Sequence, residues 1–135
     1  MIQIYNNTEE INIAAADLFI AAAQKAIAEK DKFTVVLTGG SSPAGVYKLL
    51  ASDDYKNKID WSKVFIFWGD ERWVPLNDDL SNAKTSYAAL LSHVPIPVEN
   101  IFEMYKDGVT PEDYAVTYEQ SIRSVLGDEG KFDLI

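Results

Sequence analysis

The sequence predicts an α/β fold: a Rossmann-like parallel sheet that carries helices on both faces. Two short runs of apolar and β-branched residues, 33–38 and 64–68, lack polar alternation, which is typical of strands buried on both faces. Each run is followed by a loop and then by a segment with apolar residues at helical spacing. Strands that alternate with helices pair in parallel through right-handed crossovers. We therefore expect one domain over residues 1–135.

The amino-terminal elements follow the same alternation. Residues 2–5 alternate apolar and polar side chains, which predicts a short strand. Acidic residues directly after Thr8 favour the start of an alanine-rich helix, which we expect to end at Lys30 before a turn into the first buried strand. The residues expected on the buried stripe of this helix are Ile11, Ala15, Leu18, Ala22 and Ala26.

The elements after the second buried strand are marked mainly by their caps. Ser81 is a good cap for a helix over residues 82–92, which the prolines beyond it end. Residues 101–104 predict a third short strand. A proline and a glycine mark the two ends of a helix over residues 111–126. Residues 131–135 have the composition of one more strand, so we expect a sheet that is truncated at the carboxyl end of the sequence.

The loop after the first buried strand is built almost wholly from small residues. Gly39 and Gly40 permit positive φ and the close approach of a ligand to the backbone, while Ser42 suits a helix cap and Pro43 the first helical position. Free N–H groups at such a helix start favour an anion, most often a phosphate. The loop matches neither a Walker A nor a dinucleotide fingerprint, so the phosphate would belong to a small metabolite. A plain strand-to-helix turn is the alternative.

Three consecutive charged residues, Asp70, Glu71 and Arg72, follow the second buried strand. Because the carboxyl ends of parallel strands meet at one edge of a sheet, we expect this loop to lie beside the glycine loop. Arg72 can bind a phosphate or carboxylate through two donors, and a carboxylate here can orient water or move a proton. The alternative is a surface turn fixed by an Arg–carboxylate pair.

The composition excludes several kinds of function. Twelve basic and 21 acidic residues give a net charge of −9, which argues against nucleic-acid and anionic-membrane binding. The absence of cysteine excludes disulfides, a thiol nucleophile and cysteine-based metal sites. His93 is the sole histidine and sits at a helix end, where we expect a structural or exposed role, and no spacing suggests a metal site. We find no leader and no stretch that fits a bilayer, so the expected location is cytoplasmic.

The two loops together resemble the 6-phosphogluconolactonases, within a wider group that includes the glucosamine-6-phosphate deaminases. The resemblance implies a parallel α/β sandwich that hydrolyses 6-phosphoglucono-δ-lactone to 6-phosphogluconate in the oxidative pentose phosphate pathway, with no metal or organic cofactor. The segments that carry it are Leu37–Pro43, Trp61–Pro75, Ser81-Asn82 and His93–Ile101.

The same resemblance implies roles for individual residues. Asp70 would be an active-site carboxylate that holds the catalytic histidine or the hydrolytic water. Arg72 would be the side chain that binds the negative charge of the substrate. Asn82 is a weaker candidate for lining the site. Arg72 followed by Trp73 resembles the lactonases, whereas the deaminases have a tyrosine at that point. The residues implied as the sugar-phosphate cradle are Gly39, Gly40, Ser41 and Ser42.

One signature of the family is missing from these 135 residues. It is a Gly-x-Gly-x-Asp-Gly-His stretch that follows a strand like residues 132–135, and its histidine is the general base. The resemblance therefore implies that the chain is the amino-terminal part of a larger lactonase domain and is inactive, or nearly so, alone. The alternatives are a glucosamine-6-phosphate deaminase-like isomerase and a non-catalytic module that binds a sugar phosphate.

Overall fold

Two parallel strands form the centre of the molecule. The structure, a computed structural model, describes residues 2–128 and 130–135. The strands are β1 (Phe33–Leu37) and β2 (Val64–Trp68), which pair in parallel with their first residues opposite each other. Both expected buried strands are therefore confirmed, the first of them one residue shorter than predicted.

Each side of this strand pair is extended by a single parallel bridge. Ile101 bridges to Ile66 in β2, and Leu134 bridges to Val35 in β1. The two further strands expected in the second half of the chain are thus present only as single bridges within the described residues. The order in space is Ile101, β2, β1, Leu134, all parallel.

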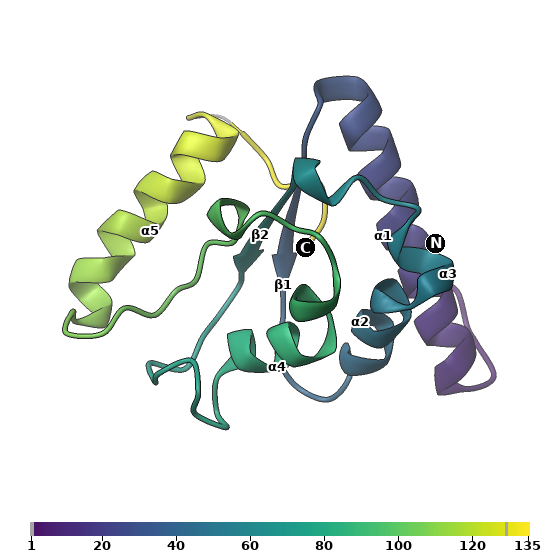
Figure 1. The fold of residues 1–135 in the computed structure, drawn as a ribbon, viewed down its shortest axis with the longest axis horizontal. Coiled ribbons are helices and arrows are strands. Elements are labelled where there is room, and N and C mark those ends of the chain that lie inside the picture. The colour runs from purple at the N-terminus through teal and green to yellow at the C-terminus, as the bar shows by residue number, and fades with distance from the viewer. Residues whose placement is uncertain (1, 129) are drawn as a thin grey trace.

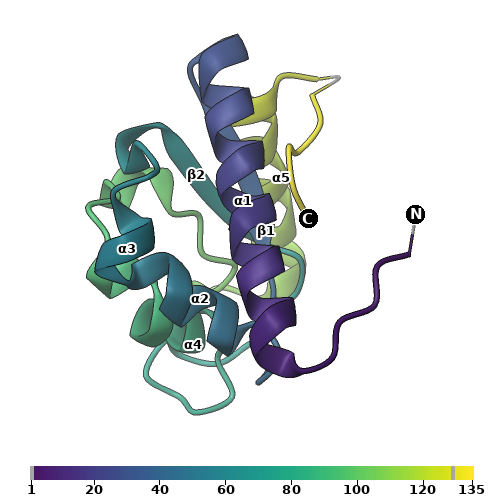
Figure 2. The same cartoon turned by 90° about the vertical axis from the view of Figure 1, so that its right-hand side faces the viewer.

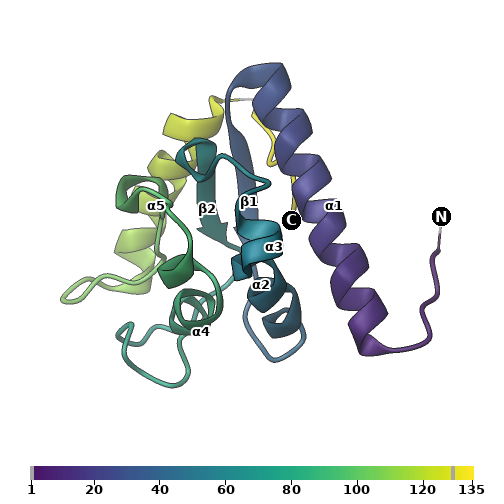
Figure 3. The same cartoon turned by 45° about the vertical axis from the view of Figure 1, so that its right-hand side comes forward.

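Helices cover both faces of the sheet, which confirms the predicted α/β class. Figure 1 shows α1 on one side of the strands and α5 on the other, and Figure 3 shows α2 and α3 on the side of α1. The helices are α1 (Thr8–Lys30), α2 (Ala44–Ala51), α3 (Asp53–Lys56), α4 (Asn82–Ala89) and α5 (Pro111–Leu126), with 3-10 turns η1 (Trp61–Lys63), η2 (Leu91–His93) and η3 (Val98–Asn100).

The two faces of the sheet bury different side chains because successive residues of a strand point to opposite faces. Phe67 faces α5, where its ring stacks on Phe102 at 4.5 Å between centroids and meets the edges of Phe132 and Tyr118. The larger cluster lies on the opposite face with α1, α2 and α4. Its strand residues are Phe33, Val35, Leu37, Val64, Ile66 and Trp68.

The expected strand at residues 2–5 is wrong. This segment pairs with no strand among the described residues, and both Ile2 and Ile4 are more than nine-tenths exposed. Figure 2 shows it running away from the body of the molecule before α1 begins. Alternation alone does not make a strand, since a strand also needs a neighbour for its backbone groups.

The expected buried stripe of α1 is correct only in part: Ala26 is buried and Ala22 is half-buried against the core cluster. Ile11 and Leu18 lie on the exposed side of the helix. The helix is rotated because Phe19 is the larger anchor: its ring meets the ring of Phe33 at 5.3 Å, edge to face. The buried residues are Ala16, Phe19, Ile20, Ala23 and Ala26.

By length and composition alone, α1 could cross a membrane, which corrects the expectation that no stretch of the chain could. Its alanines and isoleucines make it apolar along most of its 23 residues. The same composition suits a helix that covers a sheet, and one side of α1 does pack on the core cluster.

Asp133 ties the terminal segment to the sheet. Its carboxylate accepts hydrogen bonds from the backbone N–H of Thr34 at 2.8 Å and from the Thr34 hydroxyl at 2.9 Å, and it pairs with Lys30 at 2.7 Å. Burial raises the pKa of Asp133, but the hydrogen bonds from Lys30 and Thr34 outweigh it, so the pKa lies below its ordinary value.

We predict that Asp133→Asn lowers the free energy of unfolding by about 1–3 kcal/mol at neutral pH. A lowered pKa means that the contribution is present above the ordinary Asp pKa of about 4 and is lost as the pH falls through the folded-state value. Urea unfolding followed by tryptophan fluorescence at several pH values measures this. The exposed Asp54→Asn is the control, and a deficit that persists unchanged in acid would contradict the assignment.

Candidate functional site

Two loops leave the same edge of the sheet. The loop after β1 and the loop after β2 both begin at the carboxyl ends of their strands (Figure 1). The backbone N–H of Gly69 donates to the carbonyl of Leu37 at 3.2 Å, so the two loops begin side by side. This edge is where ligands gather in open parallel sheets.

The glycine loop needs both of its glycines, for different reasons. Gly40 has a φ of +88°, a conformation that favours glycine. At Gly39, a Cβ atom would lie 1.8 Å from Oδ1 of Asn82. The sequence predicted that a ligand approaches the backbone here, but at Gly39 the space for a side chain is taken by Asn82 of the protein itself.

The helix after this loop begins one residue later than expected. Pro43, with a φ of −78°, is the N-cap of α2, whereas the sequence suggested Ser42. Ser41 and Ser42 are exposed, and within the described residues no other side chain forms a hydrogen bond to them. Their hydroxyls and the neighbouring backbone are thus open to a ligand at the start of α2.

Glu71 fastens the charged loop to the start of α4. One oxygen of its carboxylate accepts from the backbone N–H of Asn82 at 2.6 Å and the other from that of Ala83 at 2.9 Å. The Ser81 hydroxyl and the backbone N–H of Arg72 also donate to it, at 3.1 and 2.8 Å. A helix start leaves such N–H groups unpaired and attracts negative charge. Glu71 therefore fixes the turn through backbone and hydroxyl donors. Among the described residues Arg72 forms no ion pair, so the turn is not held by the Arg–carboxylate pair considered as an alternative.

Asn82 connects the two loops. Its side chain is mostly buried, its Nδ2 donates to the carbonyl of Asp70 at 3.1 Å, and its Oδ1 lies against Gly39. The sequence suggested that Asn82 lines the site, and the structure puts it beneath the loops. Asp70 and Arg72 are exposed on either side of Glu71, so their side chains can reach a ligand.

Two tyrosines missed by the sequence analysis fix the strand ends from which these loops start. The Tyr47 hydroxyl donates to the carbonyl of Thr38 at 2.8 Å and accepts from its N–H at 3.1 Å. The Tyr118 hydroxyl does the same at Trp68, at 3.1 and 2.9 Å. Burial raises the pKa of Tyr118 to about 12 and raises that of Tyr47. Both were hidden because a tyrosine on a helix gives no local sign of the distant strand end that it meets.

The aromatic residue after Arg72 anchors the far side of the charged loop. The Trp73 ring meets the rings of Tyr105 at 5.2 Å and Tyr114 at 5.9 Å between centroids. Trp73 and Glu71 also line a mostly apolar pocket of about 330 Å³ against α5. The charged loop is thus held at Glu71 by α4 and at Trp73 by the aromatic cluster.

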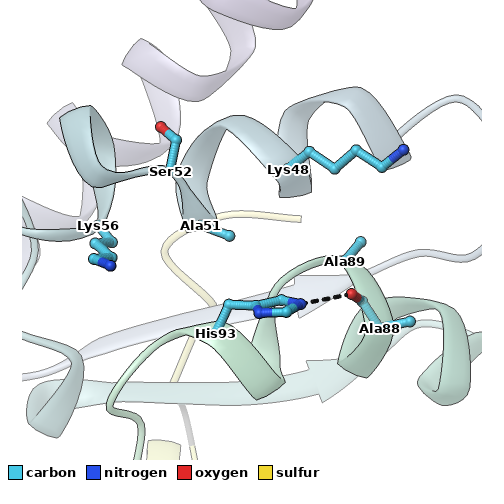
Figure 4. A pocket seen from close by; sticks show the side chains of 7 residues that line it. All are labelled: Lys48, Ala51, Ser52, Lys56, Ala88, Ala89 and His93. Carbon is cyan, nitrogen blue, oxygen red and sulfur yellow. Dashed lines mark hydrogen bonds between the residues drawn. The ribbon is translucent and has the colours of Figure 1, made fainter.

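His93 lies outside this arrangement. It is exposed in η2, and its Nε2 donates to the carbonyl of Ala88 at 2.9 Å. It lines a separate pocket, shown in Figure 4, to which neither loop contributes a residue. Among residues 2–128 and 130–135, no three His, Asp or Glu side chains are grouped as metal ligands.

The fold and the two loops define an α/β protein with two loops at the carboxyl ends of its parallel strands, the edge where ligands gather in such sheets. A family model described as glucosamine-6-phosphate isomerases/6-phosphogluconolactonase matches residues 6–135, and the chain belongs to this family. The predicted resemblance is therefore confirmed at the level of the family.

Named relatives and solved structures agree with this family. The chain is 38% identical to a 6-phosphogluconolactonase of Mycobacterium leprae over 88% of its own length, and 36% identical to the chloroplastic 6-phosphogluconolactonase 3 of Arabidopsis thaliana over 93%. It covers 49% and 38% of those two proteins. The chain thus spans half or less of the length of these relatives.

Solved structures share the fold. The crystal structure of devB protein superposes with a TM-score of 0.83 at 31% identity, over 94% of this chain and 51% of that one. The 6-phosphogluconolactonase of Thermotoga maritima superposes with a TM-score of 0.73 at 35% identity, over 84% of this chain and 50% of that one. A monomeric glucosamine-6-phosphate deaminase superposes with a TM-score of 0.77 at 19% identity, over 90% of this chain and 49% of that one. At this identity the likeness shows only that the two share a fold.

We predict that Glu71→Gln lowers the free energy of unfolding by about 1–2 kcal/mol. A glutamine keeps one acceptor oxygen but turns an NH₂ group toward an N–H that now has no partner. Thermal or urea unfolding measures the change. Glu112→Gln, in the first turn of α5, is the matched control because its carboxylate is exposed, and we expect it to change stability by less than about 0.5 kcal/mol. Equal losses in the two variants would refute the capping role of Glu71.

Proposed function

We propose that this chain forms the substrate-binding edge of a 6-phosphogluconolactonase, which hydrolyses 6-phosphoglucono-δ-lactone to 6-phosphogluconate. The observation that carries the proposal is the contact of Asn82 with both Gly39 and Asp70, since it holds the glycine loop and the charged loop together. The named relatives of the chain support the choice of substrate. As part of the same proposal, residues 1–135 belong to the amino-terminal part of a larger lactonase domain that acts in the cytoplasm.

The two loops would divide the recognition of the substrate. The backbone of Gly40 and the exposed hydroxyls of Ser41 and Ser42 suit the phosphate, because hydrogen-bond donors at a helix start favour an anion. Arg72 offers a planar guanidinium that binds an oxyanion through two donors. Asp70 is placed to orient a water molecule or the imidazole of a base.

Hydrolysis of the lactone needs a base near neutral pH and a group that stabilises the developing oxyanion. The side chain of Arg72 can supply positive charge for the second task. His93 is unsuited to the first, since it lines a different pocket. The base would therefore come from outside these 135 residues, so this edge contributes binding and electrostatics.

The deaminase-like isomerase is the competing activity within the family. In that reaction the carboxylate at Asp70 would move a proton between two carbons of the sugar. Arg72 followed by Trp73 supports the lactonase, because this pair resembles the lactonase version of the loop. Incubation with glucosamine 6-phosphate and an assay for released ammonia distinguishes the two activities.

We predict that 6-phosphogluconate binds to the chain and changes its tryptophan fluorescence, since Trp68 and Trp73 flank the charged loop. Arg72→Ala should weaken this binding by about tenfold or more, because it removes a charge-assisted contact. Arg123→Ala is the control, since Arg123 pairs with Glu119 on the exposed face of α5. Equal affinity of Arg72→Ala and the unchanged chain would rule out the proposed role of Arg72.

We also predict that a polypeptide of these 135 residues does not accelerate lactone opening, because its one histidine lies outside the site. The rate is measured as acid release from fresh 6-phosphoglucono-δ-lactone against the spontaneous reaction. Binding of 6-phosphogluconate without turnover is the expected result. Turnover above background would show that the base lies within the chain, and its loss in His93→Gln would identify that base as His93.

A further inference from the structure

A second pocket, away from the two loops, lies between α2 and the turn that connects α4 to η2. Its volume is about 420 Å³, within the range of small-molecule sites. It shares no lining residue with the glycine loop or the charged loop among the described residues. The lining residues are Lys48, Ala51, Ser52, Lys56, Ala88, Ala89 and His93.

The pocket has an apolar middle and cationic ends. Figure 4 shows the methyl group of Ala51 facing Ala88 and Ala89 across the gap, with Lys48 at one end and Lys56 at the other. The imidazole of His93 lies along the opposite wall, where its Nε2 donates to a backbone carbonyl. A ligand in this space would therefore meet a positive group at each end.

Lys48 is the cation without a partner. Among the described residues its ammonium forms no ion pair, whereas Lys56 pairs with Asp53 at 2.5 Å. Lys48 also lines an adjoining pocket of about 340 Å³ beside Lys84 and Asp79. The carboxylate in that pocket, Asp79, forms its ion pair with Lys84 at 2.6 Å and not with Lys48.

This local concentration of lysines contrasts with the chain as a whole, which carries a net charge of −9. Asp53 and Asp79, the acids that pair with Lys56 and Lys84, are both highly exposed. Because Lys48 has no such partner among the described residues, its end of the pocket keeps an unbalanced positive charge. Anions are drawn to such a positive site, and the attraction weakens with salt.

We propose that this pocket binds a small phosphorylated molecule, with Lys48 as its main cationic contact. A phosphate offers several oxygens to the unpaired ammonium of Lys48 at one end of the pocket, and the charge-assisted hydrogen bonds that it accepts are among the stronger ones. The alanine surface between the lysines accepts the less polar part of the same molecule. The proposal does not depend on the proposed lactonase function, since the two sites share no residue.

The test is an NMR titration of the ¹⁵N-labelled chain with inorganic phosphate and, separately, with pyrophosphate. We expect saturable shifts at the amides of Lys48, Ala89 and His93, with tighter binding of pyrophosphate because it carries more charge. Lys48→Gln should weaken binding by at least about fivefold, the loss expected for one partly exposed charged contact. Lys48→Arg should keep most of the affinity, and the exposed Lys25→Gln on α1 should bind as the unchanged chain does.

The Arg72→Ala variant separates the two sites. If the proposal is right, phosphate still shifts the amides of Lys48 and His93 in that variant with the same affinity. Shifts confined to residues 39–42, shifts that never saturate, or identical affinity in the Lys48→Gln and unchanged chains would each overturn the proposal. A loss of phosphogluconate binding alone would bear on the lactonase site and leave this one intact.

Discussion

The hydrogen bonds accepted by Glu71 are the constraint on which the candidate site depends. A loop of three charged residues at a strand end would ordinarily be mobile, since water satisfies its groups as well as the protein does. Here the middle residue uses its carboxylate to satisfy the N–H groups at the start of α4. Asp70 and Arg72 stay exposed on either side, held by the same backbone. The loop is thus rigid where it meets the helix and open where it can meet a ligand.

The strand ends beneath the loops are fixed in a comparable way. Each is met by a tyrosine hydroxyl that bonds both the N–H and the carbonyl of one residue, Tyr47 at Thr38 and Tyr118 at Trp68. These bonds replace sheet pairing at the point where the ladder stops. Function carried on loops depends on a rigid scaffold. The two hydroxyls provide it from opposite sides of the sheet, one from α2 and one from α5.

Most of the fold could be predicted from the sequence because its signals are local. Buried strands appear as short apolar runs, and α5 is bounded by Thr110 and Gly127 as its composition indicates. The buried side of α1 could not be predicted, because an alanine-rich helix has two similar apolar sides and the contact of Phe19 with Phe33 decides between them. The connecting role of Asn82 was also hidden, since it depends on a loop about forty residues away in the sequence.

The contact between Gly39 and Asn82 has a consequence for how the protein can vary. Any side chain at position 39 would overlap the amide of position 82, so the space available at one position is set by the size of the other. A larger residue at position 39 therefore requires a smaller or displaced side chain at position 82. The glycine loop and the first residue of α4 are therefore coupled in how they can vary, even though α2, α3, η1 and β2 lie between them along the chain.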